Sequence, residues 1–185
     1  MVFWLSGFLW NPPLLWCGWG LREDEDKTAG MRTPLRGRQL RGHDAPPMEY
    51  PISPQEKTGG IVYFGRMVEK IRLMDAGDLH PDLHANLGKG FDARCVSFLG
   101  VSYEALRDQV LAAGLDDIQA LEWCFANGKR PSNEEIEIWN DFMCKRGWND
   151  EVSEILARRK KESGFESRDD IQTMFQYIDA DEGRA

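Results

Sequence analysis

The chain has 185 residues, of which 42% are hydrophobic and 29% charged, and this ordinary globular mixture predicts one folded domain with a tail. The net charge is −8; residues 1–47 hold six basic and five acidic side chains, so residues 48–185 carry −9. A body this acidic repels phosphate backbones, which argues against nonspecific binding of nucleic acid. The four cysteines form no CxxC motif, which indicates reduced thiols in a cytoplasmic protein rather than a disulfide or metal framework.

The first 21 residues are uncharged and hold four of the seven tryptophans. They lack the basic start of a signal peptide, and Pro12 and Pro13 split the apolar run before it reaches the roughly 20 residues of a transmembrane helix. Three interpretations stay open: translation that begins at Met31 or Met48, a weak membrane or export segment, or a genuine functional arm. Residues 22–47 are polar and rich in arginine, glycine and proline. We expect residues 1–47 to be a disordered or misassigned arm and residues 48–185 to be a compact helical domain.

The first half of that domain shows three predicted segments. Apolar side chains recur at three- and four-residue steps over residues 61–74, which predicts an amphipathic helix ending near Gly77. Residues 78–91 show no sustained period and predict a loop long enough to be of functional interest. A short helix is expected over residues 91–99, closed by Gly100.

Caps and glycines mark the helices of the second half. Glycine stops are expected at Gly114, Gly128, Gly147 and Gly164. The predicted helix starts are Ser102, Asp116 or Asp117, a capping box of Ser132 and Glu135, Asn149 or Asp150, and a final S-x-x-D box of Ser167 and Asp170. Core packing is the expected role of Trp123, Trp139 and Trp148. With about seven helices and no strand alternation, the fold class is all-α, a single irregular multi-helical domain.

Loop 78–92 contains two patterns that suggest ligand chemistry. His80 and His84 have the spacing of two metal ligands on a helix, but Pro81 interrupts the motif, so structural or solvent histidines are the favoured interpretation and no metal site is predicted. Gly88-Lys89-Gly90 lacks the serine or threonine of a P-loop. These glycines either bring backbone amides to an anion beside Lys89 or simply adopt positive φ angles.

A polar pocket would form if loop 78–92 folded over the first helix. The candidate ligand-binding residues are then Arg66, Lys70, His84, Asn86, Lys89, Asp92 and Arg94. The alternative, which we favour, is that the basic side chains of that helix, including Arg72, form salt bridges with the acidic body. The basic run 158–161 falls at a helix end, where the helix dipole explains it without a nucleic-acid partner.

Several blocks of the chain together resemble one protein family. Among them are GRMVEKIR at 65–72, HANLGKGFD at 84–92, LEWCF at 121–125 and RDDIQT at 168–173. They resemble the bacterial family DUF5069, a domain of unknown function, over about residues 49–184. The resemblance implies a small, cytoplasmic, helical bacterial protein, and it implies no activity.

The sequence leaves three functions to compare. The first is a non-catalytic module that binds a small ligand, such as an anionic small molecule, or another protein. The alternatives are an enzyme that acts on an anionic small molecule through loop 78–92, and a helical nucleic-acid binder that uses residues 158–161 and the arginine-rich arm. No catalytic residue is assigned, no cofactor is expected, and no membrane contact is expected outside the arm. The specific ligand, the reaction and the oligomeric state are open at this stage.

Overall fold

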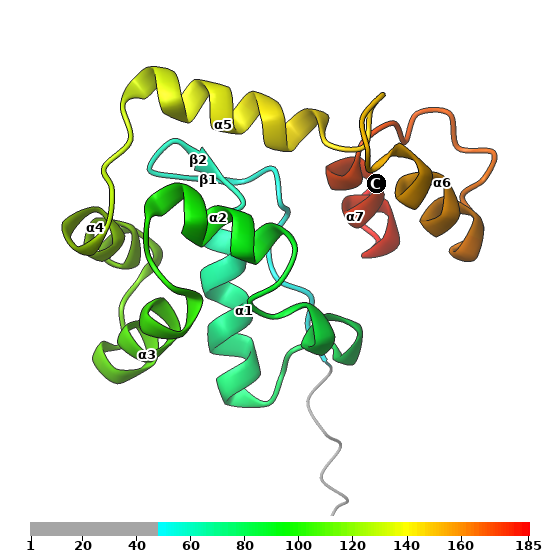
Figure 1. Ribbon diagram of the computed structural model, residues 1–185. Coiled ribbons are helices and arrows are strands. Elements are labelled where there is room, and N and C mark those ends of the chain that lie inside the picture. Colours follow the sequence, from blue (N-terminus) through cyan, green and yellow to red (C-terminus); the bar gives the residue numbers. More distant parts are fainter. Residues whose placement is uncertain (1–47) are drawn as a thin grey trace, which may run out of the picture. The chain divides into compact units, whose positions relative to one another are not determined.

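The computed structural model describes residues 48–185, and our expectations for residues 1–47 lie outside them. Within the described part, the chain forms seven α-helices, one 3-10 helix and one two-stranded sheet. Figure 1 shows how these elements are arranged. The prediction of an all-α fold is therefore confirmed. The division of the chain at residue 48 stays a prediction.

The elements follow in chain order. Strands β1 (Lys57–Thr58) and β2 (Ile61–Val62) form an antiparallel hairpin that pairs Lys57 with Val62 and Thr58 with Ile61. The helices are α1 (Phe64–Ala76), the 3-10 helix η1 (Pro81–Asn86), α2 (Phe91–Leu99), α3 (Tyr103–Ala113), α4 (Asp117–Asn127), α5 (Asn133–Lys145), α6 (Ser153–Glu162) and α7 (Met174–Asp181).

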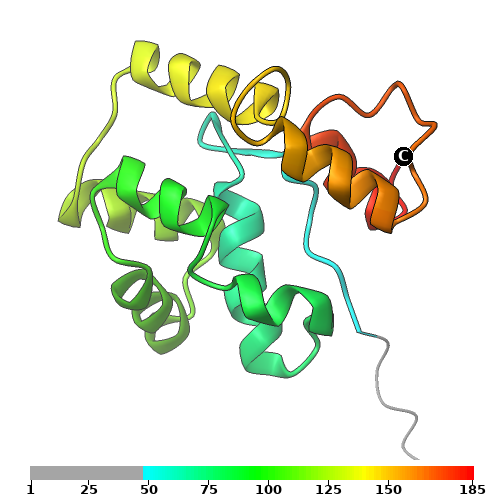
Figure 2. The same cartoon turned by 45° about the vertical axis from the view of Figure 1, so that its right-hand side comes forward.

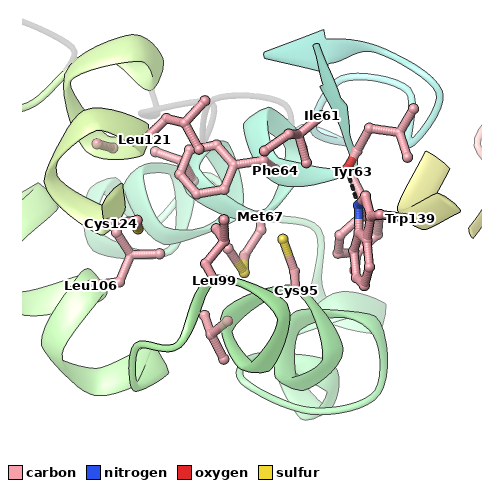
Figure 3. Packing of buried hydrophobic residues seen from close by; sticks show 14 of the residues in the cluster. Ile61, Tyr63, Phe64, Met67, Cys95, Leu99, Leu106, Leu121, Cys124 and Trp139 are labelled. Carbon is pink, nitrogen blue, oxygen red and sulfur yellow. Dashed lines mark hydrogen bonds between the residues drawn. The ribbon is translucent and has the colours of Figure 1, made fainter. Parts of the chain in front are cut away.

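Helix α1 is the centre of the larger hydrophobic core. It contacts α3 and α4, and its apolar residues include the fully buried Phe64, Met67 and Val68. Figure 3 shows side chains of α2, α3 and α4 around them. Helix α5 lies over the hairpin, where Trp139 Nε1 donates a hydrogen bond of 3.4 Å to the Val62 carbonyl (dashed in Figure 3). Asn140 of α5 adds two more such contacts, since its Oδ1 accepts from the Val62 amide at 3.0 Å and its Nδ2 donates to the Gly60 carbonyl at 2.8 Å.

Helices α6 and α7 form a smaller second core beyond the end of α5. Figure 2 shows the two helices side by side. Leu156, Met174 and Tyr177 are buried between them, and Phe91 at the start of α2 packs against both cores. This placement brings the C-terminal segment next to α1 and α2.

Short-range capping signals are confirmed at three helix starts. Ser102 caps α3, while Asp116 and Ser132 each form a capping box, with Gln119 and Glu135 respectively. The helix over residues 91–99 and its stop at Gly100 are confirmed as well. Each of these interactions lies within four residues, so the local sequence is sufficient to predict it.

Other predicted boundaries are wrong. Helix α1 begins at Phe64 rather than at residue 61, because Ile61 and Val62 pair with β1. Residues expected to form an irregular loop include the 3-10 helix η1. Helix α6 begins at Ser153, since Asp150 Oδ1 accepts the Val152 N–H and forms a turn before the helix.

The last predicted cap and one predicted core residue are also wrong. Helix α7 starts after Thr173, which forms a capping box with Gln176. The expected S-x-x-D box fails because the Asp170 carboxylate pairs with Arg168 instead. Trp148 is 55% exposed because it lies in the turn after α5 rather than on a buried face. None of the helices over residues 48–185 combines the length and the apolar character needed to cross a bilayer.

Candidate ligand-binding cleft

A cleft of about 500 Å³ lies between two walls of the domain. One wall consists of α1, η1 and the start of α2, and the other consists of α6 and α7. Its six basic lining residues are Arg66, Lys70, Lys89, Arg94, Arg146 and Arg159. We call this feature the cationic cleft.

Five of the seven residues predicted as a site line the cationic cleft. They are Arg66, Lys70, Asn86, Lys89 and Arg94. The sixth, Asp92, is fully buried and bonds to Lys70. The seventh, His84, is not among the lining residues, and its Nε2 lies 2.9 Å from the Leu79 carbonyl oxygen. Loop 78–92 therefore shares one cavity with the basic residues of α1.

A buried polar triad forms part of the α1 wall. Lys70 Nζ lies 2.5 Å from Asp92 Oδ1, and the Tyr63 hydroxyl donates to the same oxygen at 2.9 Å. Burial lowers the pKa of Lys70, against the opposing effect of Asp92. Burial, reinforced by Asp92, raises the pKa of Tyr63 well above its ordinary value. The triad thus holds two groups whose proton affinities differ from those in water.

The backbone at Tyr63 is unusual for an aromatic residue. Its φ of 72° places it in the left-handed region at the N-cap of α1. The ring packs against Phe91 and Phe175, with ring centres 5.5 and 5.9 Å away. This packing keeps the hydroxyl directed at Asp92 despite the cost of the backbone conformation.

The glycines of loop 78–92 adopt positive φ angles, 67° at Gly88 and 57° at Gly90. The Gly88 amide donates to Asp92 Oδ2 at 3.0 Å, so the protein's own carboxylate occupies this amide. A side chain at Gly88 would also meet the ring of Tyr103 at 2.8 Å. Both glycines therefore adopt the positive φ angles that were one of the two interpretations of this motif, and the Gly88 amide is occupied internally.

The predicted salt bridges of the first helix form as well. Arg66 pairs with Glu182 and donates to the Ile52 carbonyl at 2.8 Å. Arg72 points away from the cleft lining and pairs with Asp117 at 2.7 Å. Salt bridging and enclosure of a cavity are both realised, since Arg66 and Lys70 line the cleft while bonding to buried carboxylates.

The sequence reasoning missed the α6–α7 wall. Arg159 falls on the same face of α6 as Val152 and Ile155, at helical spacing, and all three line the cleft. The basic run also has structural roles, because Lys160 Nζ donates to the Arg168 carbonyl at 2.6 Å and Arg158 pairs with Glu162. The spacing of Val152, Ile155 and Arg159 was a detectable signal, although it does not reveal which surface this face meets.

Arg146 is the other basic lining residue that was not predicted as part of the site. It follows α5, and its guanidinium donates to Asp150 Oδ2 at 3.0 Å and to Glu151 Oε1 at 2.5 Å. Within residues 48–185, its Nε is the one buried side-chain nitrogen or oxygen without a hydrogen-bond partner. The hydrogen bond from Arg146 holds the pKa of Glu151 down at about 2.

The cleft is lined by more basic than acidic residues, whereas the domain as a whole carries an acidic excess. Its acidic lining residues are Asp82, Asp181 and Glu182, half as many as the basic ones. Across the described chain, no carboxylate lies within 4.0 Å of the charged nitrogens of Lys89, Arg94 or Arg159. The apolar part of the lining includes Leu83, Phe91, Val152, Ile155, Met174 and Ile178. The cleft therefore offers unpaired positive charge beside an apolar surface.

The histidine pair makes other contacts. The His80 ring stacks on Tyr50, with ring centres 4.2 Å apart, and its Nδ1 lies 3.5 Å from Asp82 Oδ2. Among the side chains that the structure describes, no group of three histidine, cysteine, aspartate or glutamate residues is placed to hold a metal ion.

Comparison with known families matches residues 48–184 to DUF5069, a domain of unknown function. The chain belongs to the DUF5069 family. The match spans all the helices that form the cationic cleft, so both walls of the cleft fall within the DUF5069 domain. A search of curated proteins finds no match.

Proposed function

We propose that this DUF5069 protein is a non-catalytic binding module for a small organic anion, which it holds in the cationic cleft. The observation that carries the proposal is the excess of basic over acidic side chains in this cavity. The domain around it has a net charge of −9, so chance composition would favour an acidic lining. Basic residues concentrated at one concave site attract anions to that site.

The shape and composition of the cleft support the same function. Its volume of about 500 Å³ lies within the range of roughly 300–1,000 Å³ that holds small organic ligands. Lys89, Arg94 and Arg159 lack carboxylate partners within the described chain, so an incoming anion competes with no internal ion pair at these residues. We further propose a cytoplasmic location, which the free thiols of Cys95, Cys124 and Cys144 support.

A matched pair of fluorescent probes tests the proposal. The anion 8-anilinonaphthalene-1-sulfonate and the neutral N-phenyl-1-naphthylamine share one aromatic body and differ by the sulfonate. We expect the anion to bind one site per chain, and more tightly than the neutral probe. Arg159→Gln should weaken binding of the anion severalfold at low ionic strength, because it removes one unpaired positive charge from the lining of the cleft.

Arg158→Gln supplies the control, because Arg158 neighbours Arg159 on α6 but is not a lining residue. It removes the same charge from the same helix and should leave both affinities unchanged. Equal binding of the two probes to the unmodified protein, or equal loss in the two variants, contradicts the proposed function.

An enzyme acting on the same anion is a second candidate, favoured by the Tyr63–Lys70–Asp92 triad. Lys70 and Tyr63 line the cleft, Lys70 has a lowered pKa, and Tyr63 has a left-handed backbone. Such groups are suited to proton transfer. Incubation of the protein with a cell's anionic metabolites, followed by mass spectrometry, distinguishes the two. Turnover that Tyr63→Phe abolishes, while that variant still binds the sulfonate probe, would replace binding by catalysis.

A further inference from the structure

We propose that the oxyanion of the ligand binds at the α5 end of the cationic cleft, where the guanidinium groups of Arg146 and Arg94 receive it. The inference rests on the proposed function and deepens it, because it assigns the charged group and the apolar body of the ligand to different parts of one cavity.

Arg146 is incompletely hydrogen-bonded. Its side chain is only 4% exposed, and two of its five N–H groups donate to Asp150 and Glu151. Nε has no acceptor, although nearly all buried polar groups in proteins have one. Arg146 thus lines the cleft and keeps an unused donor, and because Nε is itself buried, an oxyanion can accept from it once the side chain moves toward the cavity.

Arg94 and Arg146 both lie against the ring of Phe142. The guanidinium carbons of Arg94 and Arg146 lie 5.7 and 5.2 Å from the centre of the same Phe142 ring. The two arginines come from α2 and from the end of α5, and both line the cleft. Arg94 has no carboxylate within ion-pair distance in residues 48–185, whereas Arg146 has two. An oxyanion bound here would supply the counter-ion that Arg94 lacks.

An apolar surface lines the same cleft as these two arginines. Val152, the N-cap of α6, and Ile155 come only six and nine positions after Arg146, and Met174 and Ile178 line the same cleft from α7. Phe91 completes this surface from α2. The ligand class that fits is an organic anion with one oxyanion group, such as a carboxylate, sulfonate or phosphate, attached to an aromatic or branched apolar body.

Binding of the same two fluorescent probes to arginine variants tests this assignment. Arg94→Gln should weaken the sulfonate probe about tenfold and change the affinity of the neutral probe less than twofold. Arg107→Gln, at an exposed arginine of α3 outside the cationic cleft, is the control and should change neither. Arg146→Lys keeps the positive charge but removes Nε–H and should also weaken the sulfonate probe about tenfold.

A second measurement keeps the test decisive if Arg146→Lys does not fold. The arginine Nε–H signals of the unmodified protein are followed by NMR with 15N labelling. We expect one of them, assigned to Arg146 by its contacts with Phe142, to move downfield when the sulfonate probe saturates the protein. The neutral probe should leave it in place. Competition by 1-naphthyl phosphate and 1-naphthylacetate then ranks phosphate against carboxylate.

The outcomes separate the two proposals. A sulfonate probe that binds no better than the neutral one contradicts the proposed function itself. A sulfonate probe that binds selectively and depends on Arg159, but is unaffected by Arg94→Gln and leaves the Arg146 signal unmoved, overturns only the assignment of the oxyanion to the α5 end.

Discussion

Lys70 Nζ lies 2.5 Å from Asp92 Oδ1, and the two side chains are only 3% and 0% exposed. Water is excluded from this ion pair, so removal of one partner leaves the other charge without compensation. Asp92→Asn is therefore expected to lower the free energy of unfolding by about 3–5 kcal/mol, measured by urea denaturation.

The control for this prediction is Asp141→Asn, which removes an exposed partner of Lys145 on α5. Exposed pairs contribute little to stability, so this variant should unfold at nearly the same urea concentration as the unmodified protein. A similar loss of stability in both variants would show that burial of Lys70 and Asp92 does not determine the effect.

The buried hydroxyl of Tyr63 should make the stability of the protein depend on pH in the alkaline range. Burial raises its pKa above the ordinary value of 10.0, so above that pH the unfolded chain releases a proton that the folded state retains. The free energy of unfolding then falls as the pH rises, by up to about 1.4 kcal/mol per pH unit for each such group. In Tyr63→Phe the free energy of unfolding should fall less steeply with pH, by up to about 1.4 kcal/mol per pH unit, because the group that retains the proton is gone. Urea denaturation over roughly pH 9–11 measures both slopes, and identical slopes would contradict the prediction.

Ser167 is the predicted start of the last helix and Thr173 is the observed N-cap of α7, so substituting each residue tests where the helix begins. Thr173 accepts a hydrogen bond from the Gln176 amide at the N-cap of α7. Thr173→Ala should cost about 1 kcal/mol, the usual contribution of an N-cap, while Ser167→Ala should change stability by less than about 0.5 kcal/mol. Chemical denaturation gives both values. A larger loss of stability in Ser167→Ala than in Thr173→Ala would indicate that the helix begins at Ser167 instead.

The three described cysteines should differ in reactivity. Burial raises the pKa of Cys95 well above its ordinary value and that of Cys124 to about 12, and both are buried in the larger core. Cys144 is only partly buried. A thiol reagent near neutral pH should therefore modify Cys144 in the native protein, and Cys95 and Cys124 only after unfolding. Peptide mapping by mass spectrometry identifies the modified residues; native labelling of Cys95 would contradict the packing of α2.

Local sequence was sufficient for much of the fold because the decisive interactions are short in range. The capping boxes of Asp116 and Ser132 join residues three positions apart. The errors arose where two local signals compete. Ile61 continues the apolar spacing of α1 but pairs in a strand, and the Ser167 pattern lies only six residues before the true cap at Thr173.

The candidate site was predictable on one wall only. Lys89 lies between two glycines whose presence indicates a ligand loop, and Arg94 follows four residues after the second of them, on α2. Arg159 lies in the last turn of α6, where the helix dipole explains a basic residue equally well, and Arg146 follows α5 and has acidic partners close in sequence. Only tertiary packing shows that these two residues face α1 and α2, so a single sequence could not include them.

The ion pair of Arg66 with Glu182 has a consequence for the newly made protein. The two residues are 116 positions apart, so at 5–20 residues per second the ribosome adds Glu182 on the order of ten seconds after Arg66. Until then Arg66 has only backbone carbonyls as partners, and the α7 side of the cleft does not exist. Under the proposed function, the nascent chain therefore cannot bind the anion before α7 is made, and the segment that neutralises Arg66 is also the one that completes the cationic cleft.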